Sequence, residues 1–117
     1  MQPLVSLEDA RTYLRVDSYY DDSLIASLLA SAEAMCYDVT RLSSEDWAAV
    51  ISYTGLDGLT LRGDPKTHED VVRIRDLVRV SELYALGYLY EHREEADHKP
   101  LTLTLRSILY AVREGVL

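Results

Sequence analysis

The sequence predicts an all-α fold, with four main helices plus one short helix in a compact bundle and one long Gly-rich loop. Two observations lead to this prediction. Apolar residues recur at the spacing of a helix face through most of the 117 residues. Hydroxyl and acidic residues precede several of these stretches, in the pattern of helix N-caps. The length fits one domain spanning residues 1–117.

The first helix is predicted at about residues 7–16. Ser6 and Asp9 have the spacing of a capping box, in which each side chain bonds the backbone of the other residue. A second helix is predicted at about residues 22–39. We interpret Asp21 and Asp22 as its N-terminal cap.

The second helix has two distinct faces. Its apolar face holds the single cysteine, Cys36, which we expect to be buried as a small hydrophobic residue. Its opposite face carries small residues, among them Ala26 and Ala30. Small residues favour either a solvated helix of high propensity or close packing against another subunit. Both interpretations stay open, and Ala26 and Ala30 are candidate oligomer contacts.

An irregular insertion is predicted at about residues 40–66. It contains a short helix at about 46–53 and then a stretch, 55–65, with three glycines and a proline. An extended segment at 59–61 is compatible with the alternation there, although one isolated strand is not stable alone. Long loops in small domains are often functional. The candidate contact residues for a partner protein in this loop are Leu56, Leu59, Leu61 and Arg62.

The longest helix is predicted at about residues 68–95 and is apolar on nearly every side. A helix of this kind is buried on all sides, either within its own domain or against another subunit. The candidate oligomer contacts on its second apolar stripe are Val72, Val80, Leu83, Leu86 and Tyr90. The last helix is predicted at about 102–114, after Pro100, with Gly115 as its stop signal.

Charge excludes several classes of partner. The chain has 20 acidic and 12 basic residues, which gives a net charge of -8. A simple nucleic-acid-binding domain needs a basic surface, and an anionic membrane would repel this chain in the same way. No apolar run reaches the roughly 18–20 residues of a membrane span. The N-terminus lacks the pattern of a secretory signal, so we expect synthesis in the cytoplasm.

The sequence offers little for catalysis. One cysteine allows neither an internal disulfide nor a cysteine-based zinc site. No nucleophile elbow and no phosphate-binding loop is present. Glu95 and His98 have the spacing of a di-metal carboxylate motif, but such sites need two copies and further glutamates. We therefore predict a protein that is not an enzyme and that needs no cofactor or metal.

Three stretches together resemble a known family. They are Val-Ser-Leu-Glu-Asp-Ala at 5–10, Leu-Arg-Val-Asp at 14–17, and Leu-Tyr-Glu-His-Arg-Glu at 89–94, followed by a final helix that starts with a proline. In order and spacing they resemble the small head–tail connector proteins of long-tailed phages and prophages. The matched stretches leave out residues 40–66.

The resemblance implies a structural protein of the virion. Connector proteins form a ring of about a dozen copies beneath the portal protein, extend the DNA channel and present a surface to the tail or to a second head-completion protein. The expected location is the host cytoplasm at synthesis and the head–tail junction after assembly, with DNA passing through the ring but not specifically bound. The main alternative is an unrelated small all-α adaptor or regulatory domain that binds another protein.

The charge distribution adds one expectation. Residues 1–46 hold nine acids and three bases, whereas residues 71–93 hold three acids and four bases. We expect the ring contacts to use the near-neutral long helix. The acidic first helices should stay solvated or face the channel, where they would not hold phosphates.

Overall fold

The computed structural model describes residues 3–95 and 97–117. Within these residues the chain forms six helices and one two-stranded hairpin. In chain order they are α1 (Leu7–Leu14), α2 (Asp22–Thr40), α3 (Ser44–Ile51), β1 (Leu59–Leu61), β2 (Asp64–Lys66), α4 (His68–Glu91), α5 (Lys99–Ile108) and α6 (Tyr110–Arg113). The predicted all-α class is confirmed.

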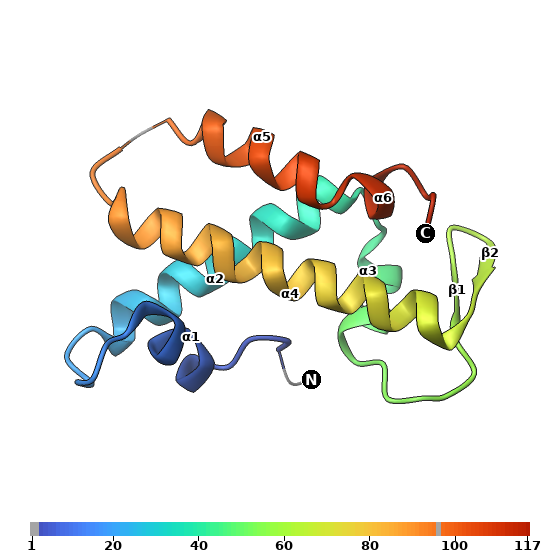
Figure 1. Ribbon diagram of the computed structural model, residues 1–117, viewed down its shortest axis with the longest axis horizontal. Helices are drawn as coiled ribbons and strands as arrows, with labels where there is room; N and C mark the ends of the chain where they lie inside the picture. Colours follow the sequence, from blue (N-terminus) through green and yellow to red (C-terminus); the bar gives the residue numbers. More distant parts are fainter. Residues whose placement is uncertain (1–2, 96) are drawn as a thin grey trace.

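The long helix α4 organises the molecule, whose extents are 43 × 28 × 19 Å. α1 and α5 lie on opposite sides of α4, and α2 crosses behind it (Figure 1). The hairpin lies at the end of the molecule where α4 begins, near the C-terminus (Figure 1). The buried core is built mainly between α2 and α4 and is completed by α1, α3, α5 and α6.

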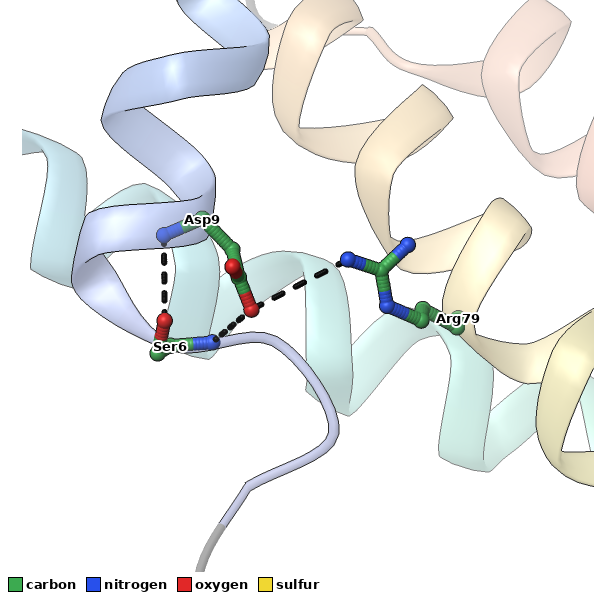
Figure 2. Close-up of polar contacts among 3 residues, drawn as sticks. All are labelled: Ser6, Asp9 and Arg79. Carbon is green, nitrogen blue, oxygen red and sulfur yellow. Dashed lines mark hydrogen bonds and ion pairs between the residues drawn. The ribbon is translucent and has the colours of Figure 1, made fainter.

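The capping box of α1 is confirmed. The Ser6 Oγ accepts from the Asp9 backbone N–H at 3.0 Å, and the Asp9 carboxylate accepts from the Ser6 backbone N–H at 3.3 Å. The same carboxylate lies 3.8 Å from the Arg79 guanidinium in α4, so the cap also contacts the central helix (Figure 2). α1 ends at Leu14, two residues before the expected end, because Arg15 has the left-handed conformation with φ 59°.

The predicted cap of α2 is confirmed in position, at Asp21, but not as a side-chain hydrogen bond. α2 begins at Asp22, but the Asp21 side chain makes no capping hydrogen bond. Its carboxylate instead accepts from the Tyr90 hydroxyl at 3.2 Å, and the Asp22 carboxylate lies 3.6 Å from the Arg11 guanidinium. Both acids are thus used to hold helices together. Cys36 is fully buried, as predicted.

The insertion contains more regular structure than expected. α3 starts two residues early, because Ser43 is its N-cap and accepts from the backbone N–H of Asp46 at 3.1 Å. The extended segment at 59–61 pairs with β2 in an antiparallel hairpin. The register leaves Arg62 and Gly63 as a two-residue turn with φ 53° and 79°, the conformation that matches strand twist in tight hairpins.

The loop before the hairpin is anchored by a tyrosine. The Tyr53 hydroxyl accepts from the Gly58 backbone N–H at 3.1 Å and lies 2.7 Å from the His68 Nδ1 at the start of α4. A Cβ atom on Gly58 would lie 1.9 Å from the Lys66 carbonyl oxygen, and the φ of 86° also favours glycine. Gly58 is therefore required for the chain to approach β2.

The C-terminal boundaries differ from the prediction. α4 ends at Glu91 and not at 95, because the run Glu91, Glu94 and Glu95 places negative charge at the negative end of the helix dipole. The last predicted helix begins earlier, at Lys99, with Pro100 in its first turn. It is divided at Leu109 into α5 and α6. Gly115 ends it with a φ of 70°, as predicted.

Candidate functional site

A surface groove of about 650 Å³ lies between the end of α1 and the C-terminal half of α4. We call it the tyrosine groove, because four of its lining residues are tyrosines. Its volume lies within the range of ligand and peptide sites in proteins. The lining residues are Tyr13, Leu14, Arg15, Tyr84, Gly87, Tyr88, Tyr90, Glu91 and His92.

The floor of the tyrosine groove depends on Gly87. A Cβ atom placed on Gly87 would lie 3.2 Å from the Tyr13 Cε2 atom, so the tyrosine ring of α1 rests directly against the backbone of α4. This contact is absent from the sequence-based predictions. The available signal was a small residue, Gly87, between Tyr84 and Tyr88 on one face of the helix.

One end of the groove is fixed by a stacked pair. The rings of Tyr88 and His92 lie 4.1 Å apart with an interplanar angle of 18°. The His92 Nδ1 donates to the Tyr88 carbonyl oxygen at 2.8 Å, which fixes the orientation of the imidazole. The Tyr90 ring is held by its hydroxyl bond to Asp21 and by the Arg93 guanidinium, 4.9 Å from the ring centroid. These contacts hold the aromatic rings in place.

The predicted oligomer contacts of α4 divide into three groups. Val72 and Val80 are 38% and 54% exposed and are available for contact. Leu83 and Tyr90 are half-buried. Leu86 is fully buried within the protomer, so its assignment as an oligomer contact is wrong. The side of α4 that carries Leu86 packs into the protomer core, which the sequence pattern alone could not distinguish from a subunit contact.

The predicted contacts of α2 lie on its exposed face. Ala26 and Ala30 are both exposed. Beside Ala30 the surface is hollowed, with Tyr37 and Trp47 among the lining residues. The rings of Tyr37 and Trp47 pack edge to face, with centroids 5.4 Å apart. The small-residue face is therefore accessible and continues into an aromatic pair.

Two of the four loop candidates are engaged inside the protomer. Leu56 is 80% exposed and Leu59 is half-buried. Leu61 is 3% exposed, so its assignment as a contact for a partner is wrong, because the hairpin turns this side chain into the core. The Arg62 guanidinium donates to the carbonyl oxygens of Thr40 and Val112. Arg62 thus has a structural role within the chain.

The chemistry of the described residues is limited. Among residues 3–95 and 97–117, no group of three or more His, Cys, Asp or Glu side chains is placed to hold a metal ion. The motif at Glu95 and His98 also includes Ala96, which lies outside the described residues. Burial, with smaller contributions from Glu82 and Glu33, raises the pKa of the Cys36 thiol, so it is not a nucleophile near neutral pH. In the same described part of the chain, no helix combines the length and apolar character needed to cross a membrane.

Comparisons with known proteins identify no relative. The chain matches no protein-family model, no curated protein and no solved structure. The fold and the surface themselves define the class of the protein as a small all-α domain with an exposed aromatic groove.

Proposed function

We propose that the chain is a head–tail connector subunit of a long-tailed phage or prophage. In this proposal, about a dozen copies form a ring between the portal protein and the tail or a second head-completion protein. The ring extends the channel through which DNA passes. The protein is made in the host cytoplasm and ends at the head–tail junction of the virion, with a structural and not a catalytic role.

The main support from the structure is the exposed apolar and aromatic surface beside α1 and α4. Val80, Tyr84 and Tyr13 each keep about half of their side-chain surface in solvent in the single protomer. Tyrosine is enriched at protein interfaces because it combines apolar area with a polar group. A neighbouring copy that covers this surface removes it from water, which favours association.

The charge distribution also supports a conduit that does not hold DNA. Three of the four bases in the long-helix region are engaged within the protomer, among them Arg93, whose guanidinium lies over the Tyr90 ring. The Arg75 guanidinium donates to the Val50 and Ile51 carbonyl oxygens at 2.6 and 2.7 Å, and Arg79 lies 3.8 Å from Asp9. An acidic chain whose bases are used internally offers few groups for displacing counterions from phosphates.

The alternative function is a small adaptor or regulatory domain that binds another protein as a monomer. The tyrosine groove also suits this alternative, because rigid aromatic rings form docking sites for peptide segments. The two functions differ in self-association. A connector subunit forms a ring with itself on the portal, whereas an adaptor binds one copy of its partner.

Self-association is tested with a pair of surface variants. The Val80→Glu variant places a charge in the exposed surface of α4, and Ser107→Glu places one on an exposed position of α5. We expect both variants to keep the helical circular dichroism spectrum, and only Val80→Glu to block ring formation on portal assemblies. Rings formed equally well by both variants would exclude the α4 surface as the subunit contact.

A further inference from the structure

A buried carboxyl group lies at the packing of α4 against α2. Glu82 is 1% exposed, and within the described residues neither of its side-chain oxygens has a hydrogen-bond partner. A buried carboxylate without partners is strongly unfavourable, so a group in this position keeps its proton or moves. Glu82 has no part in the surfaces described above.

The groups that act on Glu82 come from two helices. From α2, Glu33 adds negative charge and the buried Cys36 thiol interacts with it; from α4 itself, Arg79 adds positive charge. Burial is the main cause and the Glu33 charge the second cause of a pKa raised to about 8, which Arg79 partly offsets. The protonated form is thus the stable one at neutral pH.

Arg79 connects this carboxyl to α1. It precedes Glu82 by three residues in α4, a spacing at which side chains lie on the same helix face. Its guanidinium now points to Asp9 at the start of α1 (Figure 2). That ion pair is long, at 3.8 Å, and both side chains are nearly half exposed. An exposed pair of this kind contributes little stability, so breaking it costs little.

We propose that Glu82 is a proton-controlled switch that sets how tightly α1 is held against α4. The protonated carboxyl stays packed against α2 and leaves Arg79 with Asp9. The ionised carboxylate draws the Arg79 guanidinium away from Asp9 and loosens the start of α1. The switch is a property of the single protomer and does not depend on the connector function.

The first test measures the titration itself. The carbon-13 chemical shift of the Glu82 side-chain carboxyl, assigned with the Glu82→Gln variant, is followed against pH. We expect a midpoint well above the ordinary 4.5 of a glutamate and a lower midpoint in the Glu33→Gln variant. A midpoint near 4.5 in the wild-type chain would overturn the proposal.

The second test measures the consequence for α1 by amide hydrogen exchange. Wild type and Glu82→Gln are compared at the same pH, at about 6 and at about 9, on either side of the Glu82 pKa of about 8. We expect equal exchange at the lower pH. At the higher pH the α1 amides of the wild type should exchange about two- to fivefold faster, as for the loss of a surface ion pair.

A matched control separates the switch from general loosening. The Asp9→Asn variant lacks the ion pair at every pH but keeps an oxygen that accepts from the Ser6 N–H. In this background, the Glu82→Gln change should have no effect on α1 exchange at either pH. Two results would overturn the switch. One is equal α1 exchange in wild type and Glu82→Gln at the higher pH. The other is an effect of Glu82→Gln on α1 exchange that is unchanged in the Asp9→Asn background.

Discussion

The guanidinium of Arg62 donates a hydrogen bond to the carbonyl oxygen of Thr40, the last residue of α2. The same group donates to the Val112 carbonyl in α6, at 2.6 Å. The last carbonyls of a helix have no partner within the helix, so a side chain that reaches them stabilises its end. One hairpin residue thus joins two helix ends that are far apart in sequence.

Removing this connection should destabilise the fold without altering the surface of α4. We expect Arg62→Ala to lower the free energy of unfolding by about 1–3 kcal/mol, because two carbonyls lose a charged donor. Arg62→Lys should recover only part of the loss, because an ammonium lacks the planar fork that reaches both carbonyls. Urea unfolding followed by circular dichroism measures both values. Equal stability of Arg62→Ala and wild type would contradict this role.

Leu86 and Val80 provide a matched pair on α4. Leu86→Ala should destabilise the protein by about 2–5 kcal/mol, because it leaves a cavity at a fully buried position. Val80→Ala changes a residue that is 54% exposed and should alter stability by less than about 0.5 kcal/mol. Thermal or urea unfolding of the two variants checks this contrast. A Leu86→Ala protein as stable as Val80→Ala would place Leu86 outside the core.

Gly87 tests the tyrosine groove without breaking the helix. Alanine is a better helix former than glycine by about 1 kcal/mol, and the Tyr13 ring that it would contact is half exposed and able to shift. We expect Gly87→Ala to leave the protein at least as stable as wild type. The added methyl should displace Tyr13 and weaken ring assembly on the portal. Unfolding curves measure the stability, and sedimentation of mixtures with portal assemblies measures ring formation. A Gly87→Ala variant that assembles normally would exclude the groove from the subunit contact.

The buried Glu82 predicts a specific pH dependence of stability. Its pKa is about 8 in the folded chain against an ordinary value of 4.5, so the folded state keeps a proton that the unfolded state releases between these values. Stability therefore falls as the pH rises from about 4.5 to about 8, by up to a few kcal/mol. Glu82→Gln removes this titration. Urea unfolding at a series of pH values should show the variant gaining on wild type across this range, whereas a constant difference would contradict the assignment.

The helices were predictable because their signals are local. Ser6 with Asp9, and Ser43 with Asp46, mark helix starts that the structure contains. The hairpin turn was missed because Arg62 and Gly63 lack the asparagine or aspartate that usually marks such a turn. Asp21 occupies the predicted N-cap position of α2 but makes no capping bond, because its carboxylate accepts from the distant Tyr90 hydroxyl instead.

The candidate site was less predictable than the fold. Periodicity places Leu86 and Val80 on the same second apolar stripe, but only packing against the other helices determines which of them is buried. The tyrosine groove depends on α1 reaching Gly87, a contact between residues far apart in sequence. The burial of Glu82 was also not predictable from the sequence, because it follows from how α2 lies against α4 and not from its sequence neighbours.

The mass of the purified protein, measured by light scattering with and without portal assemblies, tests the connector proposal most directly. We predict that the chain binds portal assemblies as a ring of about a dozen copies and that Val80→Glu abolishes this ring. A chain that stays monomeric at high concentration and adds no mass to portal assemblies would contradict the proposal.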